Sequence, residues 1–122
     1  MSWRIKKKYL DLLARESGYE KKIWGKTLSV CLAYPNVYRV AMANLGFQTV
    51  YGIINSHPDC LCERAFLPDP DDEHEFSGGA ASLSSLESQK PLNEFDIIAF
   101  SIPFENDYPN ILRMLETARI PL

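Results

Sequence analysis

The sequence contains no long hydrophobic run and only three cysteines. A helix that crosses a bilayer needs roughly 18–20 apolar residues, and no segment approaches this length, so an integral membrane protein is excluded. Residues 1–8 carry charges with no apolar stretch behind them, and we therefore expect no secretory signal. An odd number of cysteines without such a signal indicates reduced thiols and a cytoplasmic protein.

The sequence also lacks a recognisable arrangement of catalytic or metal-binding residues. Its two histidines, His57 and His74, lie beside acids or proline, and no serine lies near a histidine in a known motif. Cys31 is interpreted as a core residue of an apolar strand, and the pair Cys60 and Cys62 as buried or incidental. We therefore assign no catalytic residue and no metal ligand.

The composition is that of one globular domain with an uneven charge. The 122 residues are 46% apolar and 24% charged, and the net charge is −3, values typical of a folded domain. Residues 1–26 hold eight Lys and Arg against three Asp and Glu, whereas residues 27–122 hold five against thirteen. We predict a basic amino-terminal helix or arm over residues 1–26 and an α/β domain over residues 27–122.

The basic segment permits two interpretations. In the first it is a solvated helix that lies on the acidic remainder of the chain and gains some Coulomb energy. In the second it is an arm that binds RNA or another anionic partner. We favour the first, because few aromatic residues are placed for stacking and acids interrupt the basic residues. The acidic balance of the whole chain likewise disfavours nucleic acid as a partner.

Apolar periodicity predicts alternating strands and helices. Helical spacing occurs in three segments: residues 5–13, 47–54 and 111–115. Mostly apolar strands are predicted in three others: residues 27–34, 60–67 and 96–102. This alternation implies a parallel sheet with right-handed crossovers. The predicted fold class is α/β, a Rossmann-like (flavodoxin-like) parallel sheet of about three strands with flanking helices, preceded by an amino-terminal helix.

The same pattern predicts how the elements are joined. Asn44 should cap the second helix, and residues 37–43 should form a loop. Residues 68–79 should form a solvated acidic loop, whereas residues 80–95 suit either a short helix or an irregular edge. Because the chain ends where a fourth strand is due, we expect a fragment truncated before strand 4. In the strand order 2-1-3-4-5, residues 97–102 would then be an open edge, so we expect self-association or marginal stability.

Two polar segments that follow predicted strands form the candidate site. In an open parallel sheet, ligands bind beyond the carboxyl ends of the strands. Residues 34–46 and 101–107 follow the first and third strands and are rich in hydrogen-bonding side chains. The candidate cofactor-binding residues are Asn36, Tyr38, Asn44, Ser101, Glu105 and Asn106. The alternative is that the asparagines only cap helices and turns and that Ser101 bonds the backbone.

These segments resemble a known family. Residues 34–51, YPNVYRVAMANLGFQTVY, look like the N-terminal cobalamin-binding-type domain that precedes the radical S-adenosylmethionine (SAM) barrel in a group of bacterial proteins. Residues 62–69 (CERAFLPD), 85–88 (SLES) and 100–108 (FSIPFENDY) resemble later blocks of the same group. The resemblance spans about residues 20–122, and it implies a sheet whose strand ends face a corrin ring.

The resemblance also implies how cobalamin would be held. Cobalamin domains of the mutase and methionine-synthase kind carry D-x-H-x-x-G in the first loop, and its histidine is the lower cobalt ligand. Here Asn36 begins that motif and Tyr38 stands in the place of the histidine. A neutral phenol is a poor cobalt donor, so cobalamin should bind without histidine ligation. Of a second element, S-x-L, only Ser101 is kept, and a Gly-Gly element would follow a fourth strand.

Two functions therefore stay open. The first is an accessory domain of a radical SAM enzyme that holds a His-off cobalamin. The second is a domain that binds no cobalamin and docks the barrel of the same chain or a partner chain. The cysteine spacing C-x-x-x-C-x-x-C does not occur here, so S-adenosylmethionine and a [4Fe–4S] cluster would belong to the rest of the parent protein.

Overall fold

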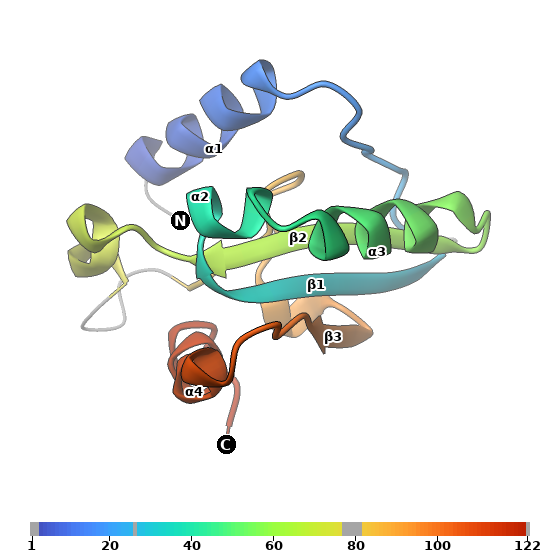
Figure 1. Ribbon diagram of the computed structural model, residues 1–122. Helices are drawn as coiled ribbons and strands as arrows, with labels where there is room; N and C mark the ends of the chain where they lie inside the picture. Colours follow the sequence, from blue (N-terminus) through green and yellow to red (C-terminus); the bar gives the residue numbers. More distant parts are fainter. Residues whose placement is uncertain (1–2, 26, 77–81, 122) are drawn as a thin grey trace.

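The protein has a sheet of three parallel strands (Figure 1). The computed structural model describes residues 3–25, 27–76 and 82–121. The strands are β1 (Leu28–Val37), β2 (Cys60–Leu67) and β3 (Ile97–Phe100), arranged in the order β2-β1-β3. β1 is the central strand, and its nearly continuous apolar sequence is what a strand covered on both faces requires. The predicted α/β fold class is confirmed.

The carboxyl end of β1 differs from the prediction. The strand continues to Val37 and leads directly into helix α2 (Tyr38–Met42), where the sequence predicted a loop over residues 37–43. The register between β1 and β2 shifts between Tyr34 and Val37. Pro35 lies in this interval and has no N–H to donate, which explains the irregular pairing. The end of β1 therefore bends before the chain enters α2.

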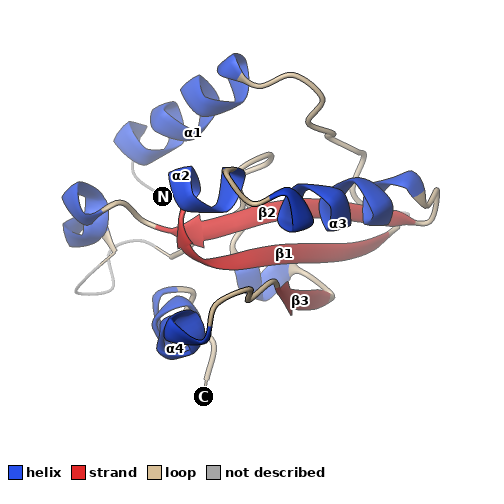
Figure 2. Ribbon diagram, in the orientation of Figure 1, coloured by secondary structure: helices blue, strands red, loops and turns tan. Residues whose placement is uncertain are grey.

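Helices α2 and α3 (Leu45–Ser56) cover one face of the sheet (Figure 2). The side chain of Asn44 caps α3, since its Oδ1 accepts a hydrogen bond of 2.9 Å from the N–H of Phe47. Phe47 is buried edge-on against Tyr34 of β1, with 5.3 Å between the ring centroids. Val50 belongs to the same apolar pattern but is 40% exposed, because α3 is apolar on more than one side.

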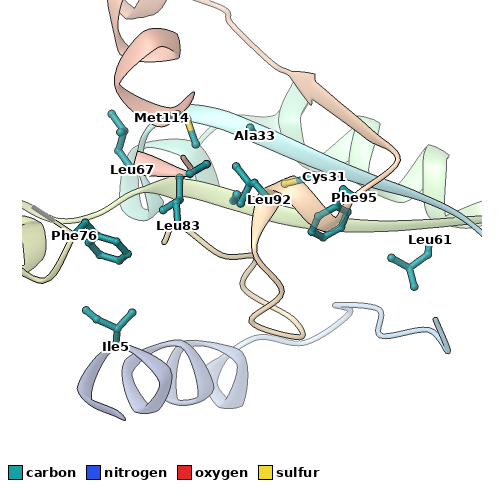
Figure 3. Close-up of a cluster of buried hydrophobic side chains, with 12 residues drawn as sticks. Ile5, Cys31, Ala33, Leu61, Leu67, Phe76, Leu83, Leu92, Phe95 and Met114 are labelled. Atoms are coloured by element: carbon teal, nitrogen blue, oxygen red, sulfur yellow. The ribbon is translucent and has the colours of Figure 1, made fainter. Parts of the chain in front are cut away.

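Helix α4 (Tyr108–Thr117) and residues 82–95 cover the opposite face (Figure 3). Leu83, Leu92 and Met114 are fully buried in the core on this side. Residues 82–95 are mostly irregular and include a short 3-10 helix, η3 (Leu92–Glu94). Leu112 belongs to the apolar pattern predicted over residues 111–115 and would face inward, but this side chain is 52% exposed and Met114 takes the inward position.

Helix α1 (Trp3–Arg15) lies on the acidic part of the chain, as the favoured interpretation of the sequence predicts. Arg4 and Lys8 each contact a carboxylate oxygen of Asp72 at 2.5 Å. Burial would raise the pKa of Asp72, but the hydrogen bonds from Lys8 and Arg4 outweigh it and lower this pKa below its ordinary value. The buried side chain Ile5 anchors the same helix in the core (Figure 3).

The acidic segment is only partly the solvated loop that the sequence predicts, since most side chains of residues 70–75 are exposed but the segment is helical and Asp72 is buried. Residues Pro70–Glu75 form a 3-10 helix, η1, in which Asp72 is only 3% exposed. The countercharges of Asp72 come from Arg4 and Lys8, which are 68 and 64 residues away in the chain. A local run of acids gives no information about such distant partners. The end of the predicted loop, with Gly78 and Gly79, lies outside the described residues.

The outer edge of β2 is closed by side chains and by a loop. Asn55 of α3 accepts from the N–H of Cys62 at 2.9 Å and donates to its C=O at 3.0 Å. The N–H of Leu86 donates to the C=O of Arg64 at 2.8 Å, and Glu87 accepts from the N–H of Arg64 at 2.9 Å. These bonds replace those of a neighbouring strand, which protects the edge.

The outer edge of β3 is open in the described part of the chain. β3 has four residues, fewer than the seven-residue segment 96–102 predicted from the sequence. The N–H of Ser101 still donates to Ala33 of β1 at 2.9 Å. Because N–H groups alternate in direction along a strand, the N–H of Phe100 points away from β1. No described residue forms a hydrogen bond with this outward side of β3.

Candidate functional site

The two polar segments identified in the sequence meet at the carboxyl ends of β1 and β3. The amide of Asn36 donates to Oδ1 of Asp107 over 3.1 Å, and the amide of Asn110 donates to the C=O of Pro35 over 3.0 Å. These bonds join the end of β1 to the beginning of α4, which follows β3 (Figure 1). The parallel sheet explains this meeting, since strands of like direction end at the same edge.

A shallow depression opens beside this junction. It is lined by residues from the end of β1, from α2, from the beginning of α3 and from the connection between β3 and α4: Tyr34, Arg39, Val40, Ala43, Asn44 and Phe104. Its volume is about 430 Å³, within the range of small-molecule sites. Phe104 is 59% exposed, and Leu45, which follows Asn44, is 77% exposed. A ligand in the depression could therefore bury apolar surface.

Tyr34 brings an unsatisfied polar group to this depression. The residue is fully buried, yet its hydroxyl proton has no acceptor within the described ranges. Burial raises the pKa of Tyr34, the carboxylate of Asp107 acts in the same direction, and a hydrogen bond from the side chain of Asn44 acts against them. A buried polar group without a partner costs about 1–3 kcal/mol. The hydroxyl is thus a group that a ligand could satisfy.

Two candidates, Asn36 and Asn44, are bonded at this edge through their side chains, and a third, Ser101, is bonded through its backbone. Asn44 lines the depression, but its Oδ1 caps α3. Asn36 donates to Asp107 and accepts from the N–H of Val37 at 2.8 Å. Ser101 is half-buried, and its N–H continues the ladder between β3 and β1. Capping, turn and backbone roles therefore account for the bonds that these residues make in the structure.

The other three candidates divide between the surface and the core. Glu105 and Asn106 lie in a short 3-10 helix, η4 (Glu105–Asp107), with exposed side chains. Tyr38 points away from the depression: its hydroxyl donates to Glu16, and its ring stands edge-on to Phe66 with 5.2 Å between centroids. Burial and then the contact with Glu16 raise the pKa of Tyr38. Residue 38 begins α2 instead of lying in a loop, which explains this different direction.

The sequence analysis missed a buried ion cluster on β2. Nε of Arg64 donates to Glu87 at 2.7 Å, and Nη2 lies 2.9 Å from a carboxylate oxygen of Glu16. The guanidinium also lies 4.5 Å from the ring centroid of Tyr51. Burial would lower the pKa of Arg64, but the adjacent Glu87 and Glu16 carboxylates raise it above its ordinary value. The cluster joins β2 to the end of α1 and to the loop of residues 85–88.

Glu63 holds the same loop from the other face of β2. Its carboxylate accepts from the hydroxyls of Ser85 and Ser88 at 2.7 and 2.5 Å, and from the indole N–H of Trp24 at 3.3 Å. Glu63 and Arg64, adjacent on β2, therefore both help to hold the loop of residues 85–88, one from each face of the strand. The signal in the sequence is an opposite-charge pair, Glu63 and Arg64, within an otherwise apolar strand.

The cysteines provide no reactive thiol at the depression. All three are free, and Cys31 and Cys62 are buried. Burial raises the pKa of Cys62 to about 12, so this thiol stays protonated near neutral pH. Within the described ranges, no group of three His, Cys, Asp or Glu side chains could hold a metal ion.

Together, the sheet and the depression define a class of protein: a parallel α/β domain with a candidate ligand site at its strand ends. None of the described helices is both long enough and apolar enough to cross a membrane. Residues 46–122 match the family described as radical SAM proteins, N-terminal. The chain belongs to this family and is an accessory domain of a radical SAM protein. No curated protein and no solved structure matches the chain.

Proposed function

We propose that this domain binds cobalamin at the carboxyl ends of β1 and β3, as an accessory domain of a radical SAM enzyme. The observation that supports the proposal is the depression at this edge, where the proton of the buried Tyr34 hydroxyl has no acceptor among the described residues. Tyr34 and Asn44 would form hydrogen bonds with the ligand, and Phe104 and Leu45 would cover its apolar surface. Bound cobalamin supplies a cobalt centre able to carry a methyl group, and this chain holds and shields it.

The residues present fit a cobalamin whose cobalt takes no ligand from the protein. Tyr38 is turned toward Glu16, and neither His57 nor His74 lines the depression. A depression of about 430 Å³ receives only part of so large a ligand. The remainder would contact exposed side chains at the same edge, among them the polar Glu105 and Asn106.

Titration of the intact protein with hydroxocobalamin tests this proposal. We expect the corrin absorption bands to shift on binding. Phe104→Ala removes the exposed aromatic ring at the depression and should weaken binding by about tenfold. Leu112→Ala is the matched control, because Leu112 is similarly exposed but lies on α4, outside the depression lining. The absence of any spectral shift at high protein concentration would retire the cobalamin assignment.

The parent protein would carry the remaining cofactors. In this proposal, S-adenosylmethionine and a [4Fe–4S] cluster are bound by a radical SAM barrel of the same chain, which this domain contacts. The membership of residues 46–122 in the family of radical SAM N-terminal domains supports that arrangement.

A docking domain without cobalamin is the second candidate, and one observation favours it. The polar groups of Asn36 and Asn44 are used within the fold, while Leu45 and Ile53 of α3 are exposed by 77% and 63%. Hydrogen exchange on the intact protein separates the two candidates. A docking domain would show protection on the exposed side of α3 in the absence of any corrin, and hydroxocobalamin would cause no further change.

A further inference from the structure

We propose that the depression contains a phosphate subsite formed by Arg39, the amino-terminal end of α3 and the hydroxyl of Tyr34. The identity of the larger ligand rests on the proposed function, whereas the phosphate chemistry rests on these three groups. The phosphate can belong to the nucleotide tail of cobalamin or to a separate phosphorylated small molecule, and the experiment below distinguishes these sources.

Arg39 provides the positive charge. It lies on α2, is exposed, and lines the depression. Within the described ranges its side chain forms no ion pair and no hydrogen bond, whereas several other cations are paired with carboxylates: Arg4, Lys8, Arg64 and Arg113. The planar guanidinium donates two parallel hydrogen bonds to phosphate oxygens more readily than a lysine does. Arg39 is therefore a cation available to a ligand at this edge.

The amino-terminal end of α3 provides backbone donors. Asn44 caps the N–H of Phe47, but the N–H groups of Leu45 and Gly46 have no partner among the described residues. These are unsatisfied donors at the positive end of a 12-residue helix, an arrangement that favours anions. A Cβ at position 46 would lie 3.2 Å from Oδ1 of Asn44, so glycine leaves the cap undisturbed and this backbone accessible.

The hydroxyl of Tyr34 is the independent observation that points to a ligand. Tyr34 is fully buried and lines the same depression as Arg39 and Asn44, and its hydroxyl proton has no acceptor in the described part of the chain. An oxygen of a bound phosphate would accept its hydrogen bond and remove the cost of the unsatisfied group. The site therefore combines a charge, a pair of backbone donors and a buried donor.

Nearby carboxylates determine where the phosphate would lie. Oδ1 of Asp107 accepts hydrogen bonds from the amides of Asn36 and Asn110 at 3.1 and 3.4 Å, and Glu105 is exposed on η4. These groups occupy the α4 side of the edge, whereas Arg39 and the end of α3 occupy the other side. The charge of Asp107 also reaches Tyr34, so repulsion from the carboxylates favours a phosphate position on the Arg39 side of the Tyr34 hydroxyl.

The test compares two corrins on the intact protein by calorimetric titration. Hydroxocobalamin carries the phosphate of the nucleotide tail, and dicyanocobinamide lacks it. We expect Arg39→Ala to weaken hydroxocobalamin binding by about tenfold to a hundredfold, the effect of one charge-assisted contact, and to leave dicyanocobinamide unchanged. Tyr34→Phe should show the same selectivity with a smaller loss. Arg15→Ala, which removes an exposed charge from α1, is the control.

Each result bears on one of the two proposals. If Arg39→Ala weakens both corrins equally or neither, the phosphate subsite is wrong while cobalamin binding stands. If neither corrin binds but adenosine monophosphate or inorganic phosphate binds in an Arg39-dependent way, the subsite stands and the cobalamin proposal fails. If none of these probes binds to the wild-type protein, both are overturned.

Discussion

The two edge strands of the sheet differ in whether their outward N–H and C=O groups have hydrogen-bond partners. At the β2 edge, Asn55 and the loop of residues 85–88 bond the outward N–H and C=O groups of Cys62 and Arg64. At the β3 edge, no described residue reaches the outward groups of a four-residue strand. The β2 edge is thus completed by the chain's own side chains, while the β3 edge can still accept another strand.

The largest effect is expected from opening the β2 edge at Glu87. Glu87→Ala removes the partner of a buried arginine, since the side chains of Arg64 and Glu87 are 3% and 0% exposed. We expect the free energy of unfolding to fall by about 3–5 kcal/mol, as measured by urea unfolding. In the control Glu73→Ala, the broken pair with Arg113 is about half exposed on both sides, and the expected loss is about 0–1 kcal/mol.

If Glu87→Ala and Glu73→Ala lowered the free energy of unfolding equally, the proposed difference between the two edges would be wrong. Such a result would mean that the loop of residues 85–88 contributes no more to stability than an exposed ion pair. Because Glu87→Ala can prevent folding altogether, Glu87→Gln serves as a milder variant that keeps the shape of the side chain, and we expect it to lie between the other two.

A smaller loss is expected at Asn55, the other closure of the β2 edge. Asn55→Ala leaves the N–H and the C=O of Cys62 without partners in a buried position. We expect a loss of about 2–3 kcal/mol in the free energy of unfolding, together with faster hydrogen exchange at the amide of Cys62. Asn93→Ala is the control, because Asn93 is exposed and should change neither quantity. Unchanged exchange at Cys62 would show that Asn55 does not protect the strand.

At the open β3 edge the expected effect is on association. We expect the 122-residue chain to self-associate through β3, because the outward groups of the strand are free to pair and Ile97 is 45% exposed. Ile97→Lys should weaken this association by about tenfold in sedimentation velocity experiments. Leu112→Lys adds the same charge on α4 and should have no effect. A stable, monodisperse wild-type monomer would contradict the prediction.

The smallest effect concerns the attachment of β3 to β1. Asp96, just before β3, accepts from the N–H and the hydroxyl of Ser29 at 2.9 and 3.0 Å. These hydrogen bonds, first that of the backbone N–H, lower the pKa of Asp96 in the folded protein. Its contribution to stability is therefore present above the unfolded pKa of about 3.9 and is lost as the pH falls through the folded value.

Urea unfolding of wild-type protein and Asp96→Asn at several pH values measures this contribution. The wild-type protein should be slightly more stable at pH 6, and the difference should shrink below about pH 4. Asp72 also has a lowered pKa and is present in both proteins, so only the difference between the two curves reports on Asp96. A difference that does not depend on pH would contradict the assignment.

The architecture could be predicted from the sequence because each element carries a local pattern. The strand over residues 60–67, the Asn44 cap and the sheet order follow from periodicity, capping and connection rules. Errors occur where a distant contact decides the outcome. Asp72 is buried because α1 supplies its countercharges, and Leu112 is exposed because Met114 takes the core position.

The candidate site was predictable at the level of the sheet edge but not of the side chain. Topology alone brings the ends of β1 and β3 together, so the location follows from the strand order. The direction of Tyr38 depends on α2 beginning at that residue, and a five-residue helix has too short a pattern to be recognised. Arg39 and Tyr34 could not be singled out, because their lack of partners becomes visible only when the neighbours are in place.

The adjacent charges on β2 also constrain how this strand can pair. Glu63 and Arg64 point to opposite faces of the sheet. Only in the observed alignment does the carboxylate meet hydrogen-bond donors and the guanidinium meet carboxylates. A slip of one residue would turn glutamate toward the carboxylates of Glu16 and Glu87, and arginine toward a serine and indole pocket made of donors. Misaligned sheets would therefore bury two mispaired charges at once. The charges of Glu63 and Arg64 thus favour one register of β2 over its neighbours.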